Sequence, residues 1–359
     1  MNRHEGPATW ESKIRGLLLG LALGDAIGSK GSDIPPTGPL EAGAATQLAA
    51  WTTEGLLRAA TRYGGHVIGN PFDVVHYAYQ RWATLRREKA APGVPWHTNL
   101  ENPEYRGWLA DVPAMAKKRG SSPSTIKALV QGRGVDSSGC QGMLRVLPFA
   151  AYALAPGDPA WMLQAVEHNA RGLVAITHEN DESWAAAGLA TRLLAETLRE
   201  ETSPQMAARR ALSGGADRVI EARIASAHQL GNAEPCVPDH LEALAPKKTA
   251  ASALAGGMYV ALSFPEPDTV AEAIEFAGWA PDGDSVAAVA GAVLGAVHGY
   301  EALPVALTSR LELGWVMDQL ARDLARQVAE NQAGAGWKSE APDPRPPLDP
   351  WWDTRYPGV

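Results

Sequence analysis

The chain has 359 residues, with 32 basic and 40 acidic side chains and a formal net charge of −8. Hydrophobic residues make up 45% and charged residues 20%, a globular composition that excludes global disorder. The acidic balance excludes general nucleic-acid binding, and the two cysteines, Cys140 and Cys236, form neither a disulfide framework nor a zinc motif.

The N-terminal region carries no targeting signal. Residues 1–5 lack the apolar core of a secretory signal. The best hydrophobic run, residues 14–27, is interrupted by Arg15 and Asp25 and is shorter than the roughly 20 residues of a membrane span. We therefore expect a cytoplasmic protein with no membrane partner.

Two stretches of the chain carry a glycine every four residues. Each glycine costs about 1 kcal/mol relative to alanine inside a helix, so a row of them needs a compensating reason. The repeat keeps the glycines on one side of each helix, where another backbone can approach closely. The two stripes are Gly16, Gly20, Gly24 and Gly28, and then Gly291, Gly295 and Gly299.

Helical patterns dominate the rest of the chain. Alanine-rich segments with apolar residues at helical spacing cover residues 184–200, 206–230, 270–277 and 311–328. No segment alternates long enough to predict a strand. We predict one all-α domain over residues 9–330, then a Pro/Trp-rich tail over residues 331–359 that holds no helix and docks on the surface or extends from it.

Two clusters of oxygen donors stand at predicted helix starts. Thr52-Thr53-Glu54 precedes the segment 55–61, and Asp282-Gly283-Asp284-Ser285 precedes the second glycine stripe. Helix caps are the commoner meaning of such residues. The same oxygen ligands also suit hard cations such as Mg²⁺, Mn²⁺ or Ca²⁺, so one cluster from each half of the chain is consistent with a metal site shared between helices.

In their order along the chain these motifs resemble the ADP-ribosylglycohydrolase family, whose type member is the dinitrogenase reductase-activating glycohydrolase. That family is all-helical and usually binds two Mg²⁺ or Mn²⁺ ions. Its motif Gly-Asp-Ala-x-Gly matches residues 24–28, its first metal motif Thr-Asp-Asp-Thr is matched to residues 52–55, and its second, Gly-Asp-x-Asp-Thr/Ser, to residues 282–288. Its phosphate loop Ser-x-Gly-x-x-Met-Arg is similar to residues 137–145, and its Thr-His element to residues 177–178.

The resemblance implies a single large domain of orthogonal helices and assigns roles to particular residues. One or two Mg²⁺ or Mn²⁺ ions would be held by Thr52, Glu54, Asp282, Asp284 and Ser285. ADP-ribose would be bound by Ser137, Ser138, Gly139, Cys140, Gly142, Met143 and His178. Glu54, Asp33 or Asp284 would assist the chemistry, Asp33 or a metal-bound carboxylate acting as the base.

The resemblance implies a metal-dependent hydrolase that cleaves the glycosidic bond at the anomeric carbon of ADP-ribose on a modified target, or a related ribosyl glycoside. The first metal motif departs from the family, because Thr53 and Gly55 replace its first aspartate and closing threonine, and Ser32 falls near a family glutamate. The alternative is therefore a non-catalytic protein of the same fold that binds ADP-ribose or a nucleotide.

Five side chains keep two interpretations each. Cys140 is a catalytic thiol or a small loop residue, and His178 contacts ligand or only packs. Arg145 reaches a phosphate or pairs with a buried acid. Trp51 or Trp279 walls an adenine pocket or anchors the fold.

Overall fold

The computed structural model describes residues 8–28, 30, 33–64, 71–88, 100–120, 122–152, 158, 161–213, 217–334 and 346–358. Across these ranges the regular elements are helices, and extended residues pair only at two isolated bridges, Leu40 with Leu311 and Val135 with His178. The all-α prediction is confirmed. None of the helices in these ranges is long and apolar enough to cross a bilayer.

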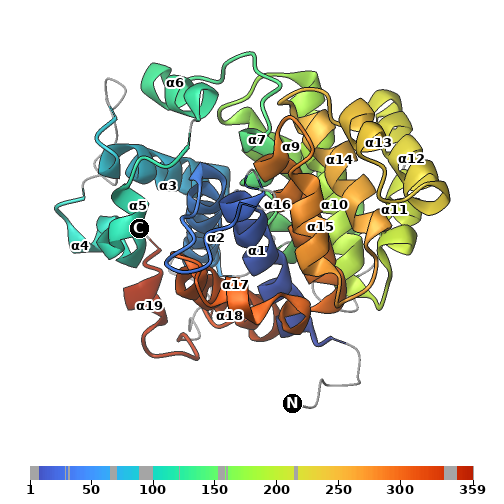
Figure 1. The fold of residues 1–359 in the computed structure, drawn as a ribbon. Helices are drawn as coiled ribbons and strands as arrows, with labels where there is room; N and C mark the ends of the chain where they lie inside the picture. The colour runs from blue at the N-terminus through green and yellow to red at the C-terminus, as the bar shows by residue number, and fades with distance from the viewer. Residues whose placement is uncertain are drawn as a thin grey trace.

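The helices follow one another as shown in Figure 1. The first half of the chain forms α1 (Trp10–Ile27), α2 (Ala44–Tyr63), α3 (Phe72–Leu85), α4 (Pro103–Arg106), the 3-10 turn η2 (Trp108–Asp111), α5 (Pro113–Ala116), α6 (Pro123–Gln131), α7 (Gln141–Leu144), α8 (Phe149–Tyr152) and α9 (Met162–Ala175). The second half forms α10 (Asp181–Arg199), α11 (Pro204–Leu212), α12 (Arg218–Ala233), α13 (Pro238–Leu244), α14 (Ala250–Ser263), α15 (Val270–Ala277), α16 (Gly283–His298), the 3-10 turn η3 (Tyr300–Ala302), α17 (Val305–Thr308), α18 (Gly314–Glu330) and α19 (Trp352–Arg355).

The two glycine stripes face each other in the centre of the fold, on α1 and α16 (Figure 1). A Cβ built on Gly16 would overlap the backbone of Gly295, and one built on Gly20 would overlap the carbonyl of Gly291. The two helices therefore touch backbone to backbone, and the close approach predicted from the repeat is confirmed. Because Gly16 meets Gly295 while Gly24 meets Ala287, α1 and α16 run antiparallel. This register brings the C-terminal end of α1 to the N-terminal end of α16.

Helix α2 begins earlier than the sequence predicted. It starts at Ala44, so Thr52, Thr53 and Glu54 lie in its middle, fully buried, and do not open a helix at Gly55. The start was missed because its N-cap is Gly43, which has no side chain to give the usual capping signal.

The segment predicted as one helix over residues 206–230 contains two, α11 and α12. Asp217 starts α12, its side chain accepting from the backbone N–H groups of Val219 and Ile220. The other predicted helical segments, 184–200, 270–277 and 311–328, correspond to α10, α15 and α18.

The tail does hold one helical turn, α19, contrary to prediction. The Trp352 side chain is fully buried and donates its indole N–H to Thr61 Oγ1 on α2 (2.9 Å). Tyr356, also fully buried, donates to Asp323 Oδ2 on α18 (2.6 Å). Two aromatic side chains thus fix the end of the tail between α2 and α18.

Candidate functional site

Three carboxylates gather where α1 ends and α16 begins. Asp25 comes from the last turn of α1, and Asp282 and Asp284 flank the first residue of α16. Burial raises the pKa of Asp284 to about 6, and the nearby charges of Asp282 and Asp25 act in the same direction. No described cation forms an ion pair with these three carboxylates, so their mutual repulsion is not offset.

Asp25 is also tied to the start of α2. Its Oδ2 atom accepts the backbone N–H of Thr46 (2.9 Å) and the Thr46 hydroxyl (2.6 Å), and the Gly43 N–H bonds to the same carboxylate. Asp25 therefore supplies the capping acceptor that Gly43 lacks. Burial raises its pKa, and the bonds from Thr46 and Gly43 oppose that shift. Through Asp25, the first turn of α2 is held against the acidic group.

The predicted phosphate loop lies beside the same group and is fixed from several sides. The Val135 N–H donates to the Thr177 carbonyl (3.1 Å), and the Ala250 N–H donates to the Ser138 carbonyl (2.8 Å). Ser137 Oγ accepts the Gly139 N–H (3.2 Å) and pairs with Ser124 Oγ (2.8 Å). The backbone N–H of Gly139, one of the residues expected to bind ADP-ribose, is thus already engaged inside the loop.

Cys140 joins the loop to α16. Its thiol lies 2.9 Å from Ser285 Oγ and 3.4 Å from Asp282 Oδ2. Burial and the Asp282 charge raise the pKa of the Cys140 thiol, so it stays protonated at neutral pH. Cys140 therefore acts as a small buried loop residue, and a thiolate nucleophile is not supported.

His178 packs under the loop. Its ring stands 3.0 Å from where a Cβ on Gly142 would be, which explains why residue 142 has no side chain, and its Nε2 side faces Gly139. Thr177 Oγ1 bonds to His178 Nδ1 (2.8 Å). Burial, reinforced by the Arg145 charge, lowers the pKa of His178 to about 3. The ring is neutral at physiological pH and supports the loop.

Arg145 fills neither of its two predicted roles. It is fully buried, and it donates to Thr125 Oγ1 (3.2 Å) and to the carbonyls of Leu173 and Val174 (both 3.4 Å). Its guanidinium lies over the Tyr79 ring at 4.5 Å from the centroid, and it pairs with no carboxylate in the described ranges. Arg145 is a core residue that positions the turn after the loop.

The central residues of α2 are engaged in the core. One oxygen of Glu54 accepts from Arg58 and the other from Arg81, and all three side chains are buried. Burial lowers the pKa of Arg81 to about 9, and the Arg58 charge adds to the effect. Thr52 Oγ1 donates to the Leu48 carbonyl (2.9 Å) and bonds to the Tyr79 hydroxyl (2.8 Å).

A comparison with protein-family models matches residues 6–334 to the family described as ADP-ribosylglycohydrolase. The chain belongs to the ADP-ribosylglycohydrolase family. Among solved structures, a chain titled "ADP-ribosylglycohydrolase-related protein complex" is 19% identical, with a TM-score of 0.57 over 89% of this chain and 99% of that one. No curated protein matches the chain. The family acts on ADP-ribosylated substrates and is one of hydrolases of glycosyl bonds.

The donors present do not fit the two-ion site usual in this family. In the part of the chain that the structure describes, no three His, Cys, Asp or Glu side chains converge on a point where an ion could bind. Both oxygens of Glu54 are taken by arginines. Glu54 is also eight residues beyond Thr46 on α2, or about 12 Å along the helix from the turn that meets Asp25.

The structure brings together Asp282, Asp284, Ser285, the Ser137–Met143 loop and His178. It places Thr52 and Glu54 apart from them, in the middle of α2. Asp33 is exposed, its backbone N–H donating to the Lys30 carbonyl (2.8 Å), and Ser32 lies outside the described residues.

Two residues of the site were missed by the sequence analysis, Asp25 and Thr46. The signal for Asp25 was the Gly-Asp-Ala-x-Gly motif, in which only the glycines were interpreted. The two tryptophans differ in exposure: Trp51 is fully buried and is a core residue, whereas Trp279 is 68% exposed.

Proposed function

We propose that this protein binds ADP-ribose, or a target that carries ADP-ribose, and does not perform the two-ion hydrolysis typical of its family. The observation that carries the proposal is an imbalance in the site. The ligand loop is fixed in place and meets α16 through Cys140, while the first turn of α2 supplies no carboxylate. It contributes only the hydroxyl and N–H of Thr46, which bond to Asp25.

The first turn of α2 is a better counterpart of the family's Thr-Asp-Asp-Thr motif than residues 52–55. It opens a helix, it contacts Asp25, and its sequence Gly43-Ala44-Ala45-Thr46 ends on the expected threonine. In this alignment both aspartates of the motif are replaced by alanine. The carboxylates on α16 are then left without the partners that would complete an ion site.

The loop supplies contacts for the ligand. The N–H groups of Ser138 and Cys140 donate to no described residue, so they are free to bond to a diphosphate. A Cβ on Gly139 would lie 3.3 Å from Ser137 Oγ and 3.8 Å from His178 Nε2, so the loop has no room for a branched side chain at this position unless it shifts. Anion binding by backbone amides needs no metal ion.

Calorimetry with ADP-ribose tests the proposal. We expect saturable binding that is the same in EDTA and in Mn²⁺, and no release of ADP-ribose from ADP-ribosyl-arginine or ADP-ribosyl-serine peptides. Gly139→Val should abolish binding, because the new side chain would crowd Ser137 and His178 and displace the loop, whereas Ala225→Val, on the exposed face of α12, should leave it unchanged. Absence of ADP-ribose binding by the wild-type protein would overturn the proposal.

A hydrolase is the second candidate, and the Asp282-x-Asp284-Ser285 motif at the start of α16 favours it. The two candidates differ in whether the protein releases ADP-ribose from the peptides. Release of ADP-ribose from either peptide, dependent on added Mg²⁺ or Mn²⁺ and lost in Asp284→Asn, would establish the hydrolase.

A further inference from the structure

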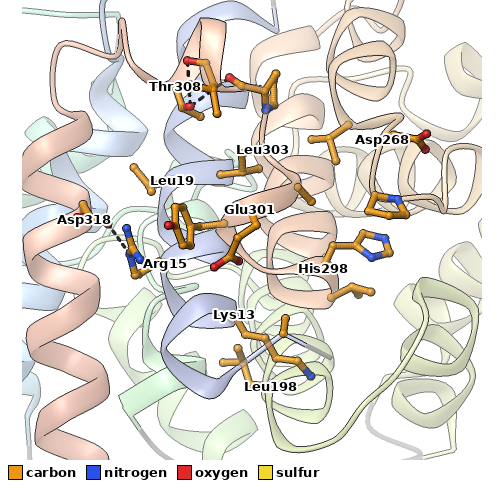
Figure 2. A pocket seen from close by; sticks show the side chains of 18 of the residues that line it. Lys13, Arg15, Leu19, Leu198, Asp268, His298, Glu301, Leu303, Thr308 and Asp318 are labelled. Atoms are coloured by element: carbon orange, nitrogen blue, oxygen red, sulfur yellow. Dashed lines mark hydrogen bonds and ion pairs between the residues drawn. The ribbon is translucent and has the colours of Figure 1, made fainter. Parts of the chain in front are cut away.

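A cavity lies at the opposite end of the α1–α16 pair from the acidic group (Figure 2). Its volume is about 1480 Å³, and its walls come from α1, the end of α10, the segment before α15, η3, α17 and the start of α18. His298 on its wall is 14 residues from Asp284, about 21 Å along α16. The cavity exceeds the roughly 300–1,000 Å³ of small-molecule sites and has room for an extended chain.

The floor of this groove is apolar. Leu19, Leu198 and Leu303 line it and are nearly fully buried. At its edge Trp315 is 58% exposed and Val305 is 71% exposed. Exposed apolar surface next to an apolar floor is typical of a binding groove, because a ligand that covers it removes it from water.

The cations that line the groove all have partners within the protein. Lys13 donates to the carbonyls of Thr197 (3.2 Å) and Glu200 (2.7 Å) at the end of α10. Arg15 pairs with Asp318 (2.6 Å), drawn as a dashed line in Figure 2, and its guanidinium lies 3.6 Å from the centroid of the Tyr300 ring. Arg199 donates to the Asp158 carbonyl (2.6 Å). Of these cations, Arg15 is paired with a carboxylate, and Lys13 and Arg199 are held by backbone carbonyls.

The carboxylates of the groove are not matched in the same way. Asp268 and Glu301 line it and are exposed, and neither forms an ion pair with a described residue, whereas Glu201 lies near enough to Lys13 to raise its pKa against the effect of burial. Glu301 accepts a bond from the Ser12 hydroxyl, a neutral partner. The groove is lined by more carboxylates than cations and carries a net negative charge; its carboxylates are Glu200, Glu201, Asp268, Glu301 and Asp318, and its cations are Lys13, Arg15 and Arg199.

We propose that this groove binds an extended basic peptide segment. Lysine or arginine side chains of the peptide pair with Asp268 and Glu301, while its apolar side chains cover the floor beside Trp315. The proposal rests on the groove alone and is independent of ADP-ribose binding at the other end of α16.

Fluorescence anisotropy with two labelled eight-residue peptides tests it, one alternating leucine with arginine and the other leucine with glutamate. The wild-type protein should bind only the basic peptide, and more weakly in 300 mM than in 50 mM salt. Asp268→Asn with Glu301→Gln should weaken binding at least tenfold. Glu242→Gln with Glu275→Gln, which removes the same charge from exposed sites outside the groove, should not.

Trp315→Ala separates groove binding from attraction to the net charge of the protein. It leaves every charge in place and should still weaken binding of the basic peptide, because it removes the apolar edge of the groove. The proposal is wrong if both peptides bind equally, if neither binds, or if the control variant loses as much affinity as the groove variant.

Discussion

The start of α16 and the middle of α2 carry the two acidic motifs of this chain, and the carboxylates of the two motifs have different partners. At the start of α16, Asp282 and Asp284 lie beside a third acid, Asp25, and have no cationic partner in the described ranges. In the middle of α2, Glu54 is enclosed by two arginines. Both motifs consist of oxygen donors, but only the first leaves its carboxylates available.

The difference shows what separates a site from a core ion pair. A carboxylate whose two oxygens both accept from guanidinium groups is electrostatically satisfied, and its removal leaves buried positive charge. A carboxylate that neighbours only other acids is held in the charged form at a cost, which stability alone does not explain. Glu54 is fully buried, whereas Asp25 and Asp284 are only partly buried, so the two places differ in exposure to solvent as well as in the partners of their carboxylates.

The comparison depends on the register between α1 and α16, and the largest effect should come from breaking that register. We expect Gly20→Leu and Gly295→Leu each to prevent folding or to lower the free energy of unfolding by more than about 3 kcal/mol, since the new side chain meets backbone that cannot move aside. Thermal denaturation measures this.

Ala225→Leu is the matched control, because it adds a side chain of similar size on an exposed face of α12. It should change the melting temperature little. A melting temperature preserved in both glycine variants would mean that the two helices do not touch as described.

Glu54→Gln tests the core side of the comparison. The variant leaves Arg58 and Arg81 buried with no negative partner, so the free energy of unfolding should fall by about 3 kcal/mol, within the range found when buried pairs lose one member. Urea denaturation at pH 7 checks this. A loss below 1 kcal/mol, together with altered ADP-ribose binding, would show that Glu54 belongs to the ligand site and not to a core ion pair.

Asp284→Asn tests the carboxylates at the start of α16, and it should raise the free energy of unfolding where Glu54→Gln lowers it. The folded-state pKa of Asp284, about 6, is above the usual value of 3.8, so the folded protein binds the extra proton and stability rises as pH falls from about 6 to 4. At pH 8 the wild-type protein keeps the unfavourable charge, and the variant should be about 1–2 kcal/mol more stable, allowing for solvent screening. Denaturation at pH 8 and pH 5 measures both; a less stable variant at pH 8 would contradict the argument.

The sequence predicted the all-α fold, the glycine contact and the acidic start of α16, because the signal for each lies in the spacing of residues that are close together in the sequence. It did not predict the start of α2. Gly43 has no capping side chain, and the capping acceptor, Asp25, is 18 residues away in the chain. Thr52-Thr53-Glu54 looked like a helix start because its residue types are those of a cap, and only the long-range contacts with Tyr79 and Arg81 reveal that it lies inside a helix.

The smallest expected effect is a gain, and it sharpens the comparison by changing α2 itself. If the first turn of α2 is the lost half of an ion site, Ala44→Asp with Ala45→Asp should place two carboxylates next to Asp25 and create Mn²⁺ binding that the wild-type protein lacks. A dissociation constant near 1 mM would raise the free energy of unfolding by about 1.4 kcal/mol in 10 mM Mn²⁺, which appears as a metal-dependent rise in melting temperature. Ala44 and Ala45 are buried, so the single variant Ala44→Asp is measured as well, and each protein is compared with itself with and without the ion. Thr53→Asp is the control, because it adds a carboxylate to the buried middle of α2, where the ion has no access. Metal-dependent stabilisation of Thr53→Asp, with none in the Ala44 variants, would show that residues 52–55, and not the first turn of α2, correspond to the family's first metal motif.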